Sequence, residues 1–374
     1  MTTPFALDGA QHAWCTELRT LTARHLRPLA ARGEPGRLNR PLVRVLGELG
    51  LLSVLLPATG TVRAMDLCLL RESLARECTD AETALALQGL GAWPVARYGT
   101  PEQRSRWLPE VVAGRAVTAF ALTEPGAGSD AAALALRAEP DAHGWRLTGE
   151  KCWISNAPEA DLCTVFARTG PAPGARGVTA FLVPGDRPGL GGSRLDMLGP
   201  HPVGTLTFDA VPVGPGDVVG EVGGGFGVAM RTLDLFRPSV GAFAVGMARA
   251  ALAAAVAHAG ERRAFGGPLK DLQAVSHQLA EMVTRTEAAA LLVYAAAAAY
   301  DAGEPGTAGR SAMAKLFATE TAQFVVDAAV QIHGACALRH GHLLEHLYRE
   351  VRAPRIYEGA TEVQRTVIAR ELYR

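Results

Sequence analysis

Residues 119–130 read AFALTEPGAGSD, and the chain changes character at this stretch. Before it, from about residue 10 to 118, the pattern is helical. Thr100, Pro101 and Gln103 form a helix start, with an N-cap, a proline in the first turn and a capping box. After it, to about residue 222, short apolar runs such as TVFAR (164–168), VTAFLVP (178–184) and TLTFDAVPV (205–213) alternate with glycine and proline. The stretch therefore joins a helical region to a compact sheet or small barrel.

From about residue 225 the helical period returns and continues nearly to the end. In residues 270–294, apolar positions repeat at three and four, at Leu272, Val275, Leu279, Met282 and Thr286. Gly303, Pro305 and Gly306 end that helix, and residues 310–334 begin another. Earlier, LVRVLGELGLLSVLLP (42–57) predicts a helix that runs into a short strand or turn. The fold class is thus α+β, with a helical domain at 1–118, a β domain at 119–222 and a helical domain at 223–374.

Composition limits the function classes. The 374 residues exceed what one hydrophobic core usually organises. Acidic and basic residues balance at 37 each, which gives no reason to expect nucleic acid or an anionic membrane as partner. The six cysteines form no CxxC pair, so we expect reduced thiols and no metal site.

Targeting signals are not evident in the sequence. MTTPFALDGA (1–10) lacks a basic region followed by an apolar run, so we do not expect a signal peptide. The apolar runs at 250–259 and 288–300 are each shorter than the roughly 20 residues of a membrane span. They predict buried bundle helices in a soluble cytoplasmic protein.

Three stretches could carry chemistry. GAGSD (126–130) can offer backbone N–H groups and hydroxyls to a polar ring edge or an anion, or it is a solvated turn between domains. Trp153, in LTGEKCWISNAPEADL (147–162), can provide a flat face, although tryptophan is more often a core residue. In RIYEGATEVQR (355–365), Glu358 is either an exposed acid at a helix end or a base held over a substrate.

These stretches, together with ERRAFGGPLKDLQ (261–273) and QIHGACAL (331–338), occur in an order that resembles the acyl-CoA dehydrogenase family. The resemblance runs from about residue 40 to the end. It implies an N-terminal all-α domain, a middle β-barrel or sandwich domain and a C-terminal four-helix bundle. It also implies FAD bound between the β domain and the bundle, in a homo-oligomer that is a tetramer or a dimer.

The resemblance also assigns residues. Glu358 matches the general base, and Asp234, Arg237, Tyr357, Gly359 and Ser129 match substrate-binding positions. The stretch from Phe120 to Ser129 would face the flavin ring and Trp153 to Ser155 would cover its other side, whereas Arg262 to Gln273 and Gln331 to Ala335 would hold the FAD of the neighbouring subunit. The cofactor-binding residues implied are Phe120, Leu122, Thr123, Gly128, Ser129, Trp153, Ile154, Ser155, Arg262, Phe265, Gln273, Gln331, Gly334, Ala335, Thr361 and Glu362.

The implied reaction makes a trans-2-enoyl thioester. Glu358 removes the α-proton of an acyl thioester while the β-hydride passes to flavin N5, and burial of this carboxylate raises its pKa. The backbone N–H of Glu358 and a flavin ribityl hydroxyl would hold the thioester carbonyl. Some relatives carry the base on another helix, but Phe236 occupies that position and cannot accept a proton. The usual electron acceptor is electron-transferring flavoprotein, and another acceptor is the alternative.

Some positions depart from the family pattern. Ala360 stands where the family usually has threonine, so one flavin hydrogen bond is lost or moves to Thr361. Ala264 and Ala335 also replace the common residues. The loops at 58–66, 167–181 and 198–208 are short or lack the usual polar run. From their composition we predict an unusual thioester carrier, an acyl carrier protein's phosphopantetheine in place of CoA.

Two other functions stay open at this point. One is a flavin oxidase or monooxygenase on the same fold, and the other is a non-catalytic assembly protein. The GAGSD, WISN (153–156) and YEG (357–359) motifs together favour the dehydrogenase.

Overall fold

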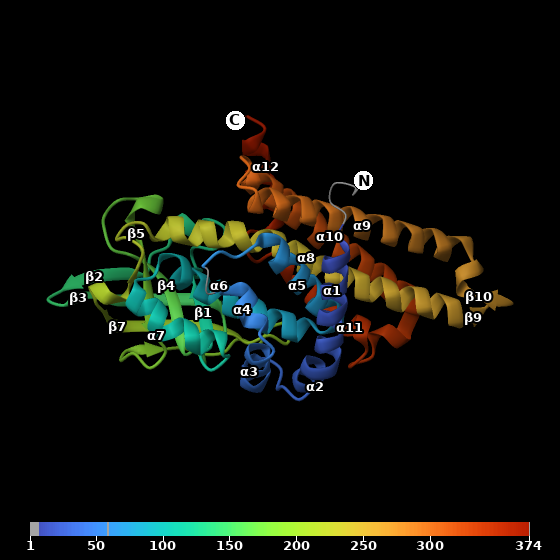
Figure 1. Cartoon of the computed structure of the whole chain (residues 1–374), viewed down its shortest axis with the longest axis horizontal. Helices are drawn as coiled ribbons and strands as arrows, with labels where there is room; N and C mark the ends of the chain where they lie inside the picture. The colour runs from blue at the N-terminus through green and yellow to red at the C-terminus, as the bar shows by residue number, and fades with distance from the viewer. Residues whose placement is uncertain (1–6, 58–59, 374) are drawn as a thin grey trace. The chain divides into compact units, whose positions relative to one another are not determined.

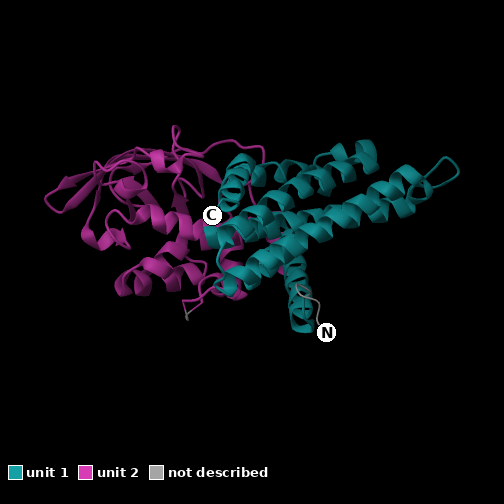
Figure 2. Ribbon diagram, turned by 90° about the horizontal axis from the view of Figure 1, so that it is seen from above, with its two compact units in different colours: residues 1–24, 63–82, 234–374 teal, residues 25–62, 83–233 magenta. Residues whose placement is uncertain are grey.

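A computed structural model describes residues 7–57 and 60–373. The chain forms two compact units, each assembled from separate segments of the sequence (Figure 2). Unit 1 contains residues 1–24, 63–82 and 234–374, and unit 2 contains residues 25–62 and 83–233. The prediction that there is no signal peptide rests on residues 1–10, of which residues 1–6 lie outside the described part, as do residues 58 and 59 of the loop at 58–66. The three-domain division at 118 and 222 stays a prediction.

Unit 2 is built on one mixed sheet. Among the described residues this sheet has eight strands in the order β6-β7-β3-β2-β4-β5-β8, and β1 pairs with β4 in parallel. All three runs expected as strands are confirmed, within β4, β5 and β7. The strands are β1 (Thr118–Ala121), β2 (Arg137–Asp141), β3 (Gly144–Ser155), β4 (Leu162–Arg168), β5 (Val178–Pro184), β6 (Leu190–Gly191), β7 (Val203–Val213) and β8 (Val218–Val219).

The described residues of unit 2 form two hydrophobic cores. Side chains such as Leu147, Val165 and Phe181 fill the first, between strands of the sheet. The second packs helical residues, among them Val95 and Trp107, against Phe166 and its neighbours. The helices of this unit are α2 (Arg27–Ala30), α3 (Arg40–Glu48), α4 (Leu51–Leu55), α7 (Pro101–Val112) and most of α6 (Thr79–Tyr98).

The helix signals before the sheet were partly right. The capping box of Thr100 and Gln103 is confirmed at the start of α7. The strand or turn expected at the end of residues 42–57 is wrong for residues 51–55. Gly50 adopts a left-handed φ of 73° and the chain then enters α4. A short apolar run has no period that separates a strand from one turn of buried helix.

Unit 1 is helical, and its longest helices run side by side (Figure 1). Gly303 to Gly306 separate α9 from α10 as expected. The helices are α1 (Gly9–Leu21), α5 (Ala64–Glu77), α8 (Gly225–Glu261, in this unit from residue 234), α9 (Gln273–Asp301), α10 (Thr307–His333), α11 (Leu343–Glu350) and α12 (Thr361–Glu371). A hairpin of β9 (Arg263–Ala264) and β10 (Gly267–Pro268) joins α8 to α9.

Small residues let the helices of unit 1 approach closely. A Cβ atom at Gly241 would lie 2.8 Å from Val293 Cγ2, and one at Gly246 would lie 2.5 Å from the Glu72 carbonyl oxygen. Burial along α9 is uneven, because Met282 and Thr286 are buried whereas Leu272, Val275 and Leu279 are only partly covered. The predicted apolar stripe is therefore fully packed only in the second half of the helix.

A polar network crosses the helices of unit 1. Glu72 on α5 accepts hydrogen bonds from Arg249 Nε on α8 at 2.9 Å and from Tyr294 Oη on α9 at 2.6 Å. Arg249 also pairs with Glu287 at 2.7 Å. Three helices are thus joined through one buried carboxylate, whose pKa burial raises in spite of Arg249.

The expectation that the apolar runs are too short to span a membrane needs correction. They lie inside α8 and α9, which are 37 and 29 residues long and apolar enough to cross a bilayer by length and composition. Inside the protein, 67% and 50% of their most apolar windows are buried. That burial matches the other part of the expectation, that they are bundle helices.

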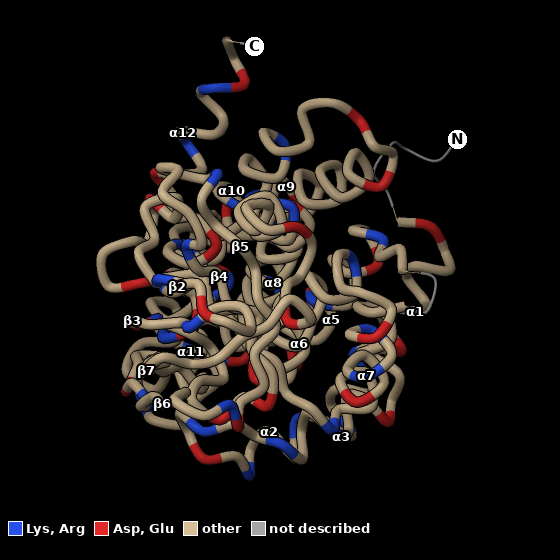
Figure 3. The backbone as a smooth tube through the Cα atoms, turned by 90° about the vertical axis from the view of Figure 1, so that its left-hand side faces the viewer, with Lys and Arg blue, Asp and Glu red and all other residues tan. Residues whose placement is uncertain are grey.

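Charge of both signs is interspersed along the backbone in the view of Figure 3. The formal net charge is zero at pH 7. No large field of one sign is therefore expected to attract a polyanion.

Candidate active site

The Tyr357–Gly359 turn of unit 1 has an unusual backbone. It lies between a 3₁₀ turn, Ala353–Arg355, and the start of α12. Glu358 has φ of 52° and Gly359 has φ of 98°, so two successive residues are left-handed. Glycine adopts this conformation freely, whereas glutamate does so at a cost of about 1 kcal/mol or more. Other contacts must therefore hold Glu358 in place.

Three side chains bind the two carbonyl groups of this turn. Lys315 Nζ, on α10, donates to the Gly359 carbonyl oxygen at 2.7 Å. Gln364 Nε2, on α12, donates to the same oxygen at 2.9 Å and to the Glu358 carbonyl oxygen at 3.2 Å. Arg237 Nε, on α8, reaches the Glu358 carbonyl oxygen at 3.3 Å. The hydrogen bonds that join described residues here use the carbonyls and leave the Glu358 N–H unused.

Gly359 is also required by space. A Cβ atom at this position would lie 2.4 Å from Gln364 Nε2, closer than atoms can approach. Gln364 is fully buried, so its amide has little room to move. The glycine therefore permits both the left-handed backbone and the hydrogen bonds of Gln364.

The Glu358 carboxyl lies in a setting suited to a base. Its Oε2 atom is buried and has no hydrogen-bond partner among the described residues. Burial raises the pKa of this carboxyl, while the positive charges of Arg71, Lys315 and Arg237 oppose the rise. A buried carboxylate oxygen without a hydrogen-bond partner is costly, and it is a feature that proteins retain at functional sites.

The sequence did not indicate Arg71 as part of this environment. It lies on α5, is fully buried, and forms an ion pair with Glu82 on α6. Its Nη1 atom donates to Ser239 Oγ on α8 at 2.7 Å, and Ser239 in turn donates to the Phe236 carbonyl oxygen. The only sequence signal was a basic residue within the apolar run of residues 67–75.

Lys315 and Gln364 were also missed. Lys315 is fully buried, and its pKa is lowered to about 8 because burial disfavours the cation. Its position gave a usable signal, since it lies three or four residues from the buried Ser311, Ala312 and Ala318. A charged residue on the inner stripe of a helix requires a partner.

The predicted substrate-binding residues of unit 1 cluster near this turn. Arg237 Nη1 pairs with Asp234 Oδ1 at 2.9 Å, one turn apart on α8. Burial raises the pKa of Asp234 in spite of that pairing. Tyr357 is exposed and Phe236 is buried. The structure thus brings Asp234, Arg237 and Glu358 together, although their substrate roles stay predictions.

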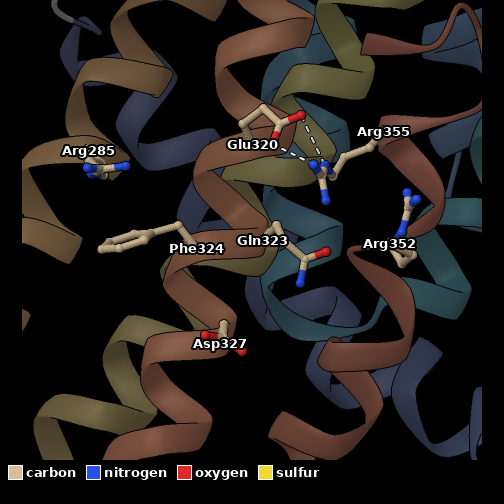
Figure 4. Close-up of a pocket in the computed structure, with 7 residues that line it drawn as sticks. All are labelled: Arg285, Glu320, Gln323, Phe324, Asp327, Arg352 and Arg355. Atoms are coloured by element: carbon tan, nitrogen blue, oxygen red, sulfur yellow. Dashed lines mark hydrogen bonds and ion pairs between the residues drawn. The ribbon is translucent and has the colours of Figure 1, made fainter.

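A hollow of about 560 Å³ lies beside the turn, between α9, α10 and the 3₁₀ turn at 353–355 (Figure 4). On its wall, Glu320 accepts from Arg355 Nε at 3.0 Å and from Thr361 Oγ1 at 3.0 Å. Glu320 thereby ties together the two ends of the Glu358 turn. The residues that line the hollow are Arg285, Glu320, Gln323, Phe324, Asp327, Arg352 and Arg355.

The predicted loss of one flavin hydrogen bond at Ala360, or its transfer to Thr361, stays a prediction. The Thr361 side chain is buried and its hydroxyl donates to Glu320. Its neighbour Glu362 is exposed at the start of α12.

In unit 2, hydrogen bonds of two buried side chains fix the start of the loop that contains GAGSD. Glu124 accepts from the backbone N–H groups of Ala135 at 2.6 Å and Leu136 at 2.9 Å. The buried Lys151 Nζ donates to Glu124 Oε1 at 2.7 Å and to the Leu122 carbonyl oxygen at 2.9 Å. Burial lowers the pKa of Lys151 to about 8. A buried ion pair therefore sets the path of the chain between β1 and the glycine-rich loop.

Trp153 is turned outward by an irregularity in β3. The pairing of β3 with β7 shifts between Lys151 and Ile154, and Trp153 has φ of 58°. Such a bulge re-aims a side chain. The Trp153 side chain is 57% exposed, whereas Ile154 is buried. The core alternative for Trp153 is therefore wrong, and its indole is free to stack on a planar ligand.

The two predicted flavin segments of unit 2 are adjacent. Cys152 N–H donates to the Thr123 carbonyl oxygen at 3.0 Å, which joins the strand of Trp153 to the glycine-rich loop. Phe120 is partly buried and packs on Phe166, with ring centroids 4.9 Å apart. Leu122 is buried, Thr123 and Ser155 are partly exposed, and Gly128 and Ser129 are exposed.

The remaining cofactor positions lie at one end of unit 1. Arg262, Phe265 and Gln273 are exposed at or beside the β9–β10 hairpin, and Phe265 is 92% exposed with a left-handed φ of 53°. His258, four residues before Arg262, stacks on His333 with centroids 4.2 Å apart. The exposed Gln331 lies in the last turn of α10, and the exposed Gly334 and Ala335 follow that helix, so the structure places both predicted groups at the same end of the helices.

Comparisons with known proteins agree along most of the chain. Three family models match: the acyl-CoA dehydrogenase N-terminal domain at residues 9–115, the middle domain at 119–211 and the C-terminal domain at 223–373. This chain belongs to the acyl-CoA dehydrogenase family. The predicted family and fold class are thereby confirmed, and the protein is an oxidoreductase of the class that acts on CH–CH groups.

Three similar proteins illustrate the match. Cyclohexane-1-carbonyl-CoA dehydrogenase of Geobacter metallireducens is 35% identical over 95% of both chains. The structure of butyryl-CoA dehydrogenase from Megasphaera elsdenii is 33% identical, with a TM-score of 0.92 over 100% of both chains. A structure described as PigA with FAD and proline is 25% identical, with a TM-score of 0.94 over 99% of both chains.

Members of this acyl-CoA dehydrogenase family depend on FAD. The donor set of the present chain fits such a group. The half-exposed indole of Trp153 offers a flat apolar face, and the hydroxyls of Thr123 and Ser129 lie on a loop that Glu124 and Lys151 fix. At the hairpin, the exposed guanidinium of Arg262 is suited to a pyrophosphate.

Proposed function

We propose that this protein dehydrogenates an acyl-CoA thioester between its α- and β-carbons, with Glu358 as the base that removes the α-proton. The observation that carries this proposal is the Glu358 carboxyl, whose buried Oε2 has no partner among the described residues. Its raised pKa makes it a stronger base than an exposed glutamate. Arg71, Lys315 and Arg237 keep it ionisable in spite of burial.

The other groups at the turn orient the reaction. The Glu358 N–H, unused by described acceptors, would donate to the thioester carbonyl oxygen and stabilise the charge that develops there. Asp234 and Arg237 lie on α8, next to the Glu358 turn, where they would contact the acyl group. Phe236 cannot act as a base, so Glu358 alone fills that role among the positions that the family uses.

FAD would be held by two sets of residues. In unit 2 these are the Phe120–Ser129 segment and Trp153–Ser155, and in unit 1 they are Arg262, Phe265, Gln273 and the Gln331–Ala335 segment of a second subunit. When bound, FAD supplies the acceptor for the hydride that leaves the β-carbon. Glu362 is exposed at the start of α12 and could contribute there, whereas the hydroxyl of Thr361 is already bonded to Glu320.

A homo-oligomer is part of this proposal. Besides Phe265, large apolar side chains are exposed along α9 and α10, namely Val283, Leu291, Leu292, Met313 and Phe317. Apolar side chains exposed along neighbouring helices indicate a protein interface. Light scattering of the purified protein should give the mass of two or four chains, and a monomer would contradict this.

The thioester carrier and the electron acceptor are finer questions. The loop between β4 and β5 is folded back by Arg168, whose guanidinium donates to the carbonyl oxygens of Ala132, Ala172 and Gly174. This compact loop supports the carrier-protein alternative, whereas the names of the relatives mention CoA. The carrier is identified by measuring kcat/KM for the same acyl group on CoA and on an acyl carrier protein. A higher kcat/KM with the acyl-CoA would contradict the carrier-protein alternative. Electron-transferring flavoprotein is the proposed acceptor in a cytoplasmic enzyme.

An anaerobic titration tests the proposed function. Wild-type protein mixed with a panel of acyl-CoA thioesters should lose its oxidised flavin absorbance with at least one member, and the 2-enoyl product should form. Glu358→Gln should retain FAD and show no bleaching. Bleaching of that variant at the wild-type rate would refute Glu358 as the base. Hydrogen peroxide formed without an acceptor would favour an oxidase, and protein that binds no FAD would favour an assembly role.

A further inference from the structure

Glu358 is held in a backbone conformation that its own side chain does not favour. Its φ of 52° is followed by 98° at Gly359, and the helix that begins at Thr361 has no side-chain cap at Ala360. Residues in such conformations persist only where the surroundings fix them. The groups that fix this turn therefore determine where the Glu358 carboxyl points.

Lys315 and Gln364 supply the shortest of the contacts to this turn. Both side chains are fully buried, and three hydrogen bonds of 2.7 to 3.2 Å join them to the two carbonyls. They approach from different helices, α10 and α12. The third ligand, Arg237, is at 3.3 Å and is shared with Asp234.

The two residues differ in charge, and that difference separates their effects. Gln364 is neutral and can only fix the backbone. Lys315 is a cation that also acts on the Glu358 carboxylate, together with Arg71 from α5 and Arg237 from α8. The charges that face Lys315 itself are Glu358, Arg237, Glu320 and Glu362.

We propose that Lys315 and Gln364 are positioning residues of the active site: both hold the Glu358–Gly359 turn through its carbonyls, and the Lys315 ammonium also places a positive charge near the Glu358 carboxyl. The proposal rests on the proposed role of Glu358 as base. It assigns a function to a buried lysine whose ammonium group, among the described residues, donates to a main-chain oxygen. A cation buried for packing alone would carry a desolvation cost that no other interaction compensates.

The pH dependence has a definite sign. Removal of the Lys315 charge removes one of three effects that lower the pKa of Glu358, so this pKa rises. The acid limb of flavin reduction then moves to higher pH, as for loss of a neighbouring opposite charge. Because the pKa of Lys315 is itself about 8, the difference in flavin-reduction rate between the wild type and a variant without this charge should become smaller above that pH.

The test is rapid-mixing flavin reduction from pH 6 to 10 in FAD-loaded protein. For Lys315→Met we expect roughly tenfold slower reduction at pH 6.5 and a limb displaced to higher pH. For Gln364→Leu we expect a slower rate, also roughly tenfold, at every pH and an unmoved limb. Lys315→Gln, which retains a donor without the charge, should show the displaced limb with a smaller loss at pH 9, and it serves if the methionine variant does not fold.

The matched control is Tyr294→Phe, which deletes a buried hydrogen bond to Glu72 elsewhere in unit 1. It should lower the thermal midpoint and leave rate and limb unchanged. If the acid limb of Lys315→Met coincides with the wild-type limb, the proposed effect of Lys315 on Glu358 is refuted. If Gln364→Leu reduces flavin at the wild-type rate, the proposed role of Gln364 in holding the turn is refuted. If Glu358→Gln reduces flavin normally, the proposed function itself fails, which separates the two failures.

Discussion

Gly359 shows how one residue controls the geometry of the site. Its φ of 98° lies where side chains are strained, and an added Cβ would meet Gln364 Nε2 at 2.4 Å. Because Gln364 is buried and bonded to both carbonyls of the turn, it cannot move without loss of those bonds. A single methyl group at this position should therefore disturb both the backbone conformation and the hydrogen bonds of Gln364 to the turn.

We predict that Gly359→Ala lowers the free energy of unfolding by about 1–3 kcal/mol. Flavin reduction should slow at least tenfold, because the Glu358 carboxyl is no longer aimed by its turn. Urea unfolding and rapid mixing measure the two effects. Gly260→Ala is the control, since that glycine lies in α8 with open space around it and should be neutral or slightly stabilising. Equal behaviour of the two variants would contradict the requirement for glycine at 359.

At the scale of elements, the loop of residues 122–129 and the strand that carries Trp153 depend on one buried ion pair. Lys151 and Glu124 connect β3 to this loop, and Glu124 also binds two backbone N–H groups of residues 135 and 136. Loss of one partner of such a pair leaves an uncompensated buried charge.

We predict that Lys151→Met lowers unfolding free energy by about 3–5 kcal/mol and lowers the flavin content of purified protein. Replacement of both partners, as Lys151→Met with Glu124→Gln, should recover part of the stability, because no unpaired charge is left. The ratio of flavin to protein absorbance and the thermal midpoint measure these effects. Full flavin content in Lys151→Met would show that the ion pair does not fix the conformation of the loop.

Sequence reasoning was most accurate where local patterns decide structure. The capping box at Thr100 and the strands around Val165 and Phe181 follow from turn residues and periodicity, and they were found. Residues 51–55 were assigned wrongly, because a run of leucines in a short segment has no diagnostic period.

The candidate site was predictable only in part. The motifs indicated Glu358, Trp153 and the glycine-rich loop, because these residues occur within recognisable stretches. Lys315 and Arg71 were missed, since their partners lie at Gly359 and Ser239, 44 and 168 residues away along the chain. Contacts of that separation depend on how whole helices pack, which one sequence without homologues does not reveal.

At the scale of the whole molecule, the two buried lysines affect how stability depends on pH. The pKa values of Lys151 and Lys315 are about 8 in the folded chain, against an ordinary value of 10.5. Between these values the unfolded chain binds more protons, so these lysines make folding more favourable as pH rises from 8 to about 10.5. Below pH 8 both states are protonated and the full cost of burying the cations is present.

We predict that the stability of Lys315→Met rises less over this interval than that of the wild type. The difference in the change of unfolding free energy should be on the order of a few kcal/mol at most. Urea unfolding at pH 7.5 and pH 10 gives the four values required, and other groups that titrate in both proteins cancel. Parallel pH dependences would show that Lys315 has an ordinary pKa.

The central claim is that Glu358 removes the α-proton of an acyl thioester, and proton exchange tests it most directly. Wild-type protein with bound FAD, held anaerobically with an acyl-CoA in deuterated water, should introduce deuterium at the α-carbon, because the Glu358 carboxyl exchanges the abstracted proton with solvent and returns a deuteron. NMR of the thioester follows this exchange without any electron acceptor. We predict exchange with the wild type and none with Glu358→Gln that retains its FAD. Undiminished exchange in that variant would contradict the account.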